Sequence, residues 1–153
     1  MTVHHTLTIY RPGTGPIRPA SPVSNPPDYY FEFADTPARM HPFGHIWLNN
    51  RNPAKITIEL EIVTPKFVFK NNGPGKTDGS PALFISLNPA SKTSFLGSNG
   101  AFTNPTLDST TFRTLTFSTL NVGGLFYYYQ LNVIDQDSGD QLVTWDPIIV
   151  NQP

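Results

Sequence analysis

The sequence predicts an all-β protein, folded as an antiparallel sandwich of two sheets with about 8–9 strands. Two observations lead to this class. Sixteen prolines and 11 glycines are spread along the 153 residues, so few windows are long enough for a helix, where an interior proline costs about 3 kcal/mol. The windows that remain alternate between apolar and polar residues, as strands do. Long connections suit a Greek-key topology, and immunoglobulin-like and cupredoxin-like variants both stay open.

The composition excludes some classes of binding partner and of metal site. One domain spanning residues 1–153 is expected. The net charge of -1 gives no cluster of positive charge for nucleic acid. Cysteine is absent, which excludes disulfides and thiolate metal sites. Charged residues make up only 14%, so Thr, Ser, Asn and Gln must supply the polar surface, as in many proteins that self-associate.

The amino terminus predicts no targeting segment. The first ten residues lack a basic stretch followed by an apolar run, which a signal peptide requires. No stretch approaches the roughly 20 apolar residues that span a bilayer, so no membrane span is expected. The expected location is the cytoplasm, or outside the cell after export by a non-classical route.

The first half of the chain alternates in two clear strands. Residues 3–10 form the first, with Val3, His5, Leu7 and Ile9 on one face. The proline-rich segment 11–27 is expected to be an extended surface crossover. Short strands are predicted at 28–33 and 45–48. Residues 55–63 show the strongest pattern, with isoleucine and leucine facing in and Thr57, Glu59 and Glu61 facing water.

The second half predicts further strands and one long loop. Residues 66–70 either continue the preceding strand past a bulge or start the next one. Strands follow at 82–87 and 110–120, separated by a polar loop at 88–109. The chain closes in a hairpin of 125–134 and 141–150 around the polar turn 135–140. Its predicted core faces carry Leu125, Tyr127, Tyr129, Leu131 and Val133 on the first strand, and Val143, Trp145 and Ile149 on the second.

The polar turn holds the candidate metal ligands. Asp135, Asp137 and Asp140 place three carboxylates within six residues, and calcium takes oxygen ligands from short acidic loops. The same residue types are also what a plain hairpin turn requires, and no later glutamate completes an EF-hand loop. No cofactor is therefore expected, with calcium at this turn as the alternative. A histidine metal site at His41 and His45 is a further alternative to ordinary surface or packing histidines.

The closing hairpin also holds the candidate binding residues. Phe126, Tyr128 and Gln130 fall on the strand face opposite the core, next to Asn132, and Trp145 lies on the partner strand. Aromatic rings supply contact area and amides supply directed hydrogen bonds, so this row suits sugar rings or a protein partner. The alternative is that another sheet or loop covers the row.

Catalytic motifs are not found. The chain has no Gly-x-Ser-x-Gly elbow, and Glu59 and Glu61 occupy the wet face of a strand. The sequence Gly75-Lys76-Thr77 lacks the earlier glycine and the following helix of a phosphate-binding loop. We therefore expect no enzymatic activity.

The carboxyl-terminal end of the chain resembles a known family. An aromatic strand, a polar turn and the run Trp145-Asp146-Pro147-Ile148-Ile149-Val150 are similar to the end of bacterial inclusion-body proteins of the AidA/PixA type. The resemblance covers about the last 25 residues. It implies a β-sandwich, a bacterial source, no leader, no known catalysis and a tendency to accumulate or assemble. It carries over no functional residues.

The sequence thus supports two hypotheses on function. The first is a non-enzymatic β-sandwich that acts by self-association, as a homo-oligomer, or by binding a protein partner. The second is a carbohydrate-binding module, calcium-assisted through Asp135, Asp137 and Asp140, with Tyr128 or Trp145 against the sugar.

Overall fold

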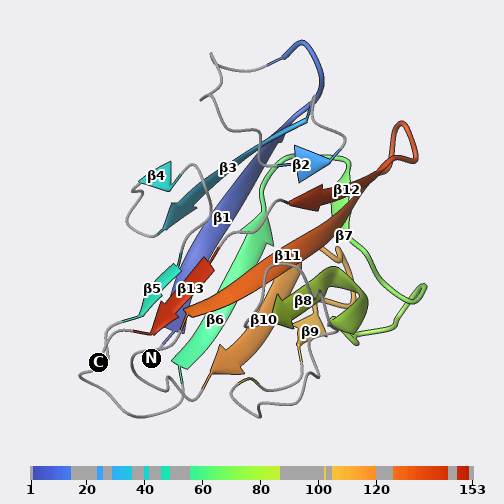
Figure 1. Ribbon diagram of the computed structural model, residues 1–153. Helices are drawn as coiled ribbons and strands as arrows, with labels where there is room; N and C mark the ends of the chain where they lie inside the picture. The colour runs from blue at the N-terminus through green and yellow to red at the C-terminus, as the bar shows by residue number, and fades with distance from the viewer. Residues whose placement is uncertain are drawn as a thin grey trace.

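Two β-sheets pack face to face in the computed structural model (Figure 1). The structure describes residues 2–14, 24–25, 29–35, 40–41, 46–48, 56–86, 102, 105–119, 126–144 and 148–151. Within these ranges the only helical element is the single 3-10 turn η1 (Ser80–Ala82). The predicted all-β sandwich class is confirmed.

The first sheet has six strands. Its order is β4 (Met40–His41), β3 (Tyr30–Asp35), β1 (Thr2–Tyr10), β6 (Ile56–Ile62), β10 (Thr114–Thr119) and β9 (Thr106–Leu107). Its edge strands β4 and β9 are two residues long, which leaves little unpaired backbone at either edge.

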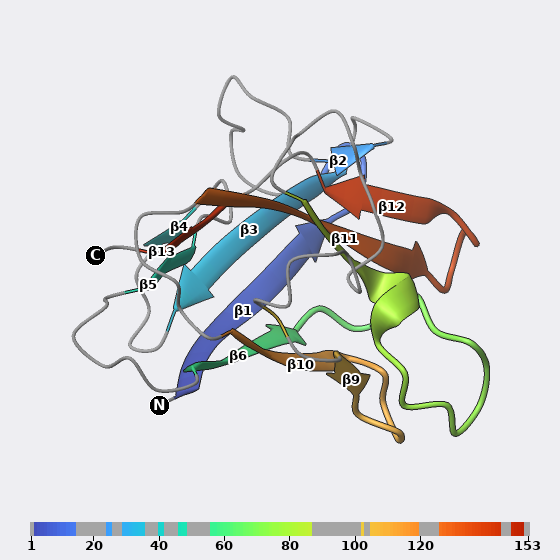
Figure 2. The same ribbon diagram turned by 60° about the horizontal axis from the view of Figure 1, so that its bottom comes forward.

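The second sheet has seven strands arranged around β11 (Phe126–Asp135). Its path is β2 (Ser24–Asn25), β12 (Gln141–Thr144), β11, β13 (Ile148–Asn151) and β5 (Ile46–Leu48), and β7 (Phe67–Phe69) and β8 (Leu83–Ser86) also pair with β11. The ten residues of β11 are long enough to pair with two successive short strands on each side, β12 and β13 on one and β7 and β8 on the other. The strands of this sheet are therefore shorter and more numerous than the sequence predicts. Figure 2 shows this layer above that of β1, β6 and β10.

Two pairings differ from the antiparallel pattern that the sequence predicts. Strand β1 runs parallel to β6, and β13 runs parallel to β5. Parallel neighbours need a long crossover, and the chain between β1 and β6 supplies one because it contributes β2 and β5 to the second sheet and β3 and β4 to the first. The remaining described pairings are antiparallel.

The predicted core faces are largely confirmed. Strand β6 alternates strictly, with Ile56, Ile58, Leu60 and Ile62 buried. His5, Leu7 and Ile9 of β1 are buried, and so are Tyr127, Tyr129, Leu131 and Val133 of β11. These side chains fill the space between the two sheets, together with Phe31, Phe33, Phe67, Phe69 and Phe117. Burial of this apolar surface is the main stabilising contribution to the sandwich.

The core face predicted for the last strand, 141–150, is wrong in its first part, β12. There the buried residues are Leu142 and Thr144, whereas Val143 is half-buried. Trp145 and the side chain of Ile149 lie outside the described residues. Leu142 stands directly opposite the buried Val133, and opposite residues of an antiparallel pair share a face. Thr144 is buried because its hydroxyl accepts a hydrogen bond from the backbone amide of Leu131 at 2.9 Å.

The segment after β6 starts a new strand in the other sheet. The chain turns at Val63–Lys66, where Lys66 has a φ of 70°, and β7 then pairs with β11. The hydroxyl of Thr64 accepts a bond from the Ile9 amide at 2.8 Å, which ties this corner to β1. A strand that changes sheets at a sharp corner closes one end of a sandwich. Most of the predicted crossover 11–27 and of the predicted loop 88–109 lies outside the described residues.

Candidate functional site

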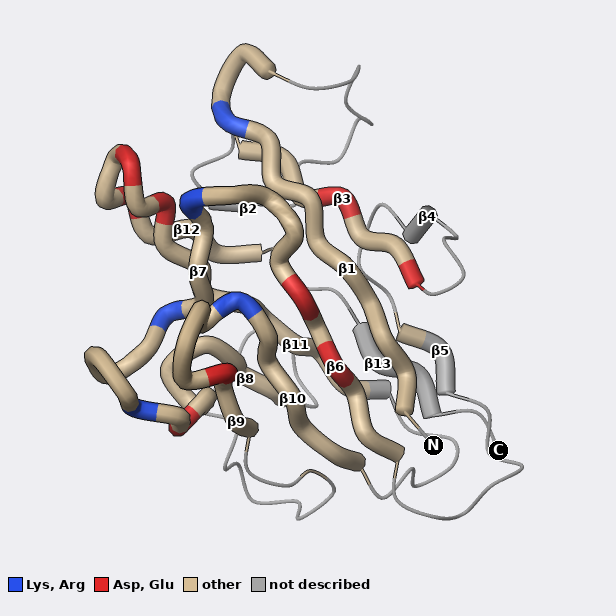
Figure 3. The backbone as a smooth tube through the Cα atoms, turned by 180° about the vertical axis from the view of Figure 1, so that it is seen from behind, with Lys and Arg blue, Asp and Glu red and all other residues tan. Residues whose placement is uncertain are grey.

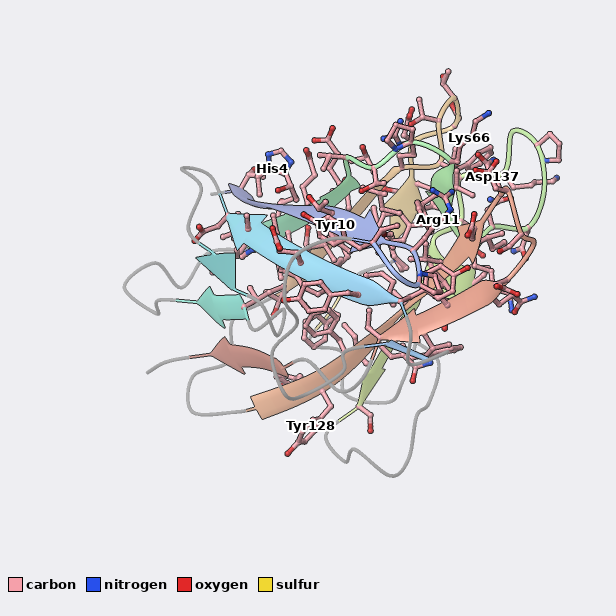
Figure 4. All side chains as sticks on the ribbon, turned by 90° about the horizontal axis from the view of Figure 1, so that it is seen from above. His4, Tyr10, Arg11, Lys66, Tyr128 and Asp137 are labelled. Carbon is pink, nitrogen blue, oxygen red and sulfur yellow. The ribbon has the colours of Figure 1, made fainter. Side chains whose placement is uncertain are left out.

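The acidic turn between β11 and β12 is organised by a salt bridge from the opposite sheet. Asp135 ends β11 and is fully buried. Arg11, which follows β1, donates from Nη2 to Asp135 Oδ1 at 3.0 Å and from Nε to Oδ2 at 3.3 Å. Figure 4 shows Arg11 and Asp137 at the same end of the sandwich. These two hydrogen bonds therefore connect the end of β1 to the hairpin in the second sheet.

The hydroxyl of Tyr29 forms a further hydrogen bond with this buried carboxylate. It donates to Asp135 Oδ2 at 2.9 Å and lies 3.0 Å from Asp140 Oδ2 and 3.3 Å from Ser138 Oγ. A phenol has a single proton, so the two carboxylate oxygens compete for it, whereas the Ser138 hydroxyl has a proton of its own to donate. The Tyr29 ring stands edge-on to Phe67, with centroids 6.4 Å apart.

Arg11 has two further partners at the turn. Its Nη2 donates to Asp137 Oδ2 at 3.0 Å, and its Cζ lies 4.5 Å from the centroid of the Phe67 ring. This cation–π contact and the two carboxylates hold the guanidinium over the corner where β7 begins. The turn itself is closed by the Gly139 amide, which donates to the Asp135 carbonyl at 2.8 Å. Gly139 has a φ of 79°, a conformation that favours glycine.

The pKa of the Asp135 carboxyl shows the balance of these contacts. Burial by itself raises this pKa, but the hydrogen bonds from Arg11 and Tyr29 outweigh burial and lower it to about 2. The hydrogen bond to Asp135 likewise raises the pKa of Arg11. Burial is the main cause that raises the pKa of Tyr29. Arg11 and Asp135 therefore form an ion pair between the two sheets in which both side chains are charged.

This geometry favours the plain-turn interpretation of the three aspartates. A guanidinium already occupies the space between Asp135 and Asp137, and the remaining oxygen of Asp135 faces Tyr29. Over the ranges that the structure describes, no group of three His, Cys, Asp or Glu side chains could hold a metal ion. Calcium binding at Asp135, Asp137 and Asp140 stays a prediction, which a thermal shift on adding calcium, lost in Asp137→Ala, would test.

The predicted histidine site falls mostly outside the described residues. This applies to His45 and to the side chain of His41. The other two histidines of the chain alternate on β1. His5 is buried in the core, and His4 faces outward between Glu59 and Glu61.

Of the two alternatives left open for the row of aromatics and amides on β11, an exposed row or a covered one, the covered alternative applies to its amides. Gln130 and Asn132 are each only 8% exposed, whereas Tyr128 is half-buried and points away from the core in Figure 4. The side chain of Phe126, and Trp145 as a whole, lie outside the described residues. One reason for the burial of the amides is η1, because Asn132 Nδ2 donates to the Pro81 carbonyl at 3.0 Å.

Two successive hydrogen bonds fix the orientation of the side-chain amides of Asn132 and Gln130. The Pro81 carbonyl can only accept, so Asn132 must present its amino group there and turn Oδ1 toward Gln130. Gln130 then donates from Nε2 to Asn132 Oδ1 at 3.2 Å. Among the described residues, this leaves Gln130 Oε1 as a buried acceptor without a hydrogen-bond partner. Such an acceptor is rare in native proteins.

The outer face of the six-stranded sheet is the third candidate surface. His4 of β1 lies 3.1 Å from Glu61 and 3.7 Å from Glu59 of β6. Short hydroxyl side chains surround this group, and all of them are half-buried: Thr6, Thr8, Thr57, Thr114 and Thr116. The predicted wet face of β6 is thus confirmed.

Comparisons with known proteins add no family. No protein-family model matches the sequence, and no curated protein matches it. Over the described part of the chain, no helix is long and apolar enough to cross a membrane.

Sequence reasoning missed Arg11 and Tyr29. Arg11 meets Asp135 across 124 positions of the chain and Tyr29 meets it across 106, so no local spacing connects them. The only local signal is that Arg11 directly follows a clear strand whose outward residues carry no other arginine or lysine.

Proposed function

We propose that this protein is a non-catalytic β-sandwich that acts by binding another protein surface, in the first place that of a second copy of itself. The observation that supports it is the outer face of β1, β6 and β10. These strands lie side by side (Figure 3), and most of their outward residues are threonines. Short side chains on this sheet face allow close approach, and few are charged, so little desolvation opposes contact.

A matched pair of variants tests this proposal. Thr116→Arg places a long cation in the middle of the face, whereas Thr110→Arg places the same residue in the exposed β9–β10 turn. We expect the first variant to raise the dissociation constant of the homo-oligomer at least about tenfold, because each copy must bury an arginine. The control should change it less than about twofold. Sedimentation velocity measures both, and equal effects would exclude this face.

A second candidate function, carbohydrate binding, is favoured by the unpartnered Gln130 Oε1. Tyr128 lies two residues away on the same strand face, and Phe84 stands opposite Gln130 on β8. Sugar hydroxyls are donors and sugar rings stack on aromatic side chains, so the group fits a glycan better than an anion. A glycan array probed with the wild-type chain and with Gln130→Leu would test it. Signals that Gln130→Leu retains would contradict it.

The hydrogen bonds of Asn132 and Gln130 predict that replacing each side chain by leucine changes the free energy of unfolding by a different amount. Asn132→Leu leaves the Pro81 carbonyl and the Gln130 amino group without partners, so we expect the free energy of unfolding to fall by about 2 kcal/mol. Gln130→Leu exchanges one unpartnered oxygen for another, Asn132 Oδ1, and should lie within about 1 kcal/mol of wild type. Urea denaturation measures both, and equal losses would contradict the amide orientation.

A further inference from the structure

The loop between β7 and η1 contains an exposed asparagine that is followed by a glycine, Asn72-Gly73. Figure 2 shows this loop projecting from the sandwich. The side chain of Asn72 forms no hydrogen bond with the residues that the structure describes. An asparagine before a glycine is prone to lose its side-chain ammonia, because a glycine has no side chain that hinders attack by its backbone nitrogen.

The conformation of the loop requires the glycine at this position. Gly73 has a φ of 118°, which favours glycine, and its carbonyl accepts a hydrogen bond from the Lys76 amide at 3.1 Å. A Cβ atom at Gly73 would meet no atom within 4 Å, so backbone conformation rather than crowding selects the glycine. The turn therefore places the residue type that makes Asn72 reactive directly after it.

The nitrogen that would attack Asn72 is bonded to the side chain of Asn71. The Gly73 amide donates to Asn71 Oδ1 at 3.0 Å, and Asn71 Nδ2 donates to the Phe69 carbonyl at 3.0 Å. Both ends of the Asn71 side-chain amide are thus bonded, so its oxygen is held at the Gly73 amide. Attack requires that this amide loses its proton, and an amide that donates to an acceptor loses its proton less readily.

We propose that Asn72 is a site of spontaneous deamidation and that Asn71 is a positioning residue that slows the reaction. In the reaction, the Gly73 nitrogen bonds to Asn72 Cγ, and the bond from Cγ to Nδ2 breaks. The side-chain nitrogen leaves as ammonia with the proton from Gly73, and a cyclic imide remains. Water then opens either carbonyl–nitrogen bond of the imide and yields aspartate or isoaspartate. Only water is consumed, and the loop gains one negative charge.

The second pair of this kind in the described loop, Asp78-Gly79, lacks the features that make Asn72 reactive. Gly79 is buried, and its amide donates to the Pro105 carbonyl at 3.0 Å. The carboxylate of Asp78 accepts hydrogen bonds from the amide and the hydroxyl of Ser80, both at 3.0 Å. Both reacting groups are therefore engaged, and we expect no conversion at Asp78.

Two substitutions of Asn71 form a matched test. Asn71→Ala and Asn71→Asp both remove the donor to the Phe69 carbonyl, but only Asn71→Asp keeps an acceptor for the Gly73 amide. We expect folded Asn71→Ala to deamidate at Asn72 at least about fivefold faster than the wild type, the factor that one hydrogen bond contributes. Folded Asn71→Asp should stay within about twofold of the wild type. Peptide mass spectrometry after incubation in mildly alkaline buffer measures the conversion, and Asn72→Gln identifies the site.

Incubation in urea separates the loop geometry from the identity of the neighbouring residue. The hydrogen bonds of the loop are absent there, so the wild type and both Asn71 variants should convert at similar rates, and the wild type faster than when folded. Thermal unfolding checks that each variant folds. A folded wild type that converts as fast as it does in urea would overturn the proposal. Equal rates for the two folded Asn71 variants, or an Asn71→Ala chain no faster than the wild type, would overturn it as well.

Discussion

Replacement of Arg11 by methionine is expected to lower the free energy of unfolding by about 3 kcal/mol, because it leaves a buried carboxylate without its cation. Asp135 is fully buried, and the guanidinium supplies two of the hydrogen bonds to its oxygens. Methionine keeps an apolar chain but removes the charge and the guanidinium carbon that lies over the Phe67 ring. The Tyr29 hydroxyl, the Asp137 amide and the Ser138 hydroxyl would remain as donors. Urea denaturation at neutral pH measures the loss.

Asp137→Asn provides the matched control for this prediction. Asp137 bonds to the same guanidinium, but its side chain is 59% exposed. An exposed ion pair contributes little, so the control should change the stability by less than about 0.5 kcal/mol. Equal effects of the two substitutions, or no effect of Arg11→Met, would contradict the structural role assigned to the buried pair.

Acid is expected to weaken the fold through the same carboxylate. The pKa of Asp135 is about 2 in the folded chain and about 4 in an unfolded one, so the folded state holds the proton less tightly. Its contribution to stability is present above about pH 4 and is lost as the pH falls through the folded pKa. The contribution is roughly 2–3 kcal/mol.

A comparison of the wild type with Asp135→Asn isolates this contribution. The variant cannot titrate at that position, so the fall in its stability between pH 7 and pH 2 should be smaller than that of the wild type by roughly 2 kcal/mol. Urea midpoints at a series of pH values measure the difference. Parallel pH profiles for the two chains would show that Asp135 is not held ionised by Arg11.

The sequence predicts those parts of the fold that local alternation determines. Strand β6 separates the core from water at every position, because one face meets the other sheet and the other meets solvent. On β11 the predicted core residues Tyr127, Tyr129, Leu131 and Val133 are buried as well, but Gln130 and Asn132 on the other face of the strand are also buried. Burial alternates in β12 too, but the apolar residues point to the wrong face, because the buried Thr144 is a polar residue that satisfies the backbone amide of Leu131. Nothing in the local pattern distinguishes it from a solvent-facing threonine.

The candidate sites depend on contacts that local patterns do not contain. Asp135 was expected in a polar turn, but it ends a strand and is buried against Arg11, 124 positions away in the sequence. For Gln130 and Asn132 the sequence leaves both an exposed and a covered row open. Asn132 donates to the Pro81 carbonyl of η1, a turn that the pattern does not predict. In both places long-range hydrogen bonds decide the burial of polar side chains.

The mass of the wild-type chain in solution is the most direct test of the proposed function. Light scattering coupled to size-exclusion chromatography, over a concentration series at low and high salt, would measure it. Self-association through the outer face of the six-stranded sheet predicts a mass that rises above the 17.0 kDa of one chain as the concentration increases. Because few residues of this face are charged, the rise should persist in high salt. A constant mass of one chain under every condition would contradict the account.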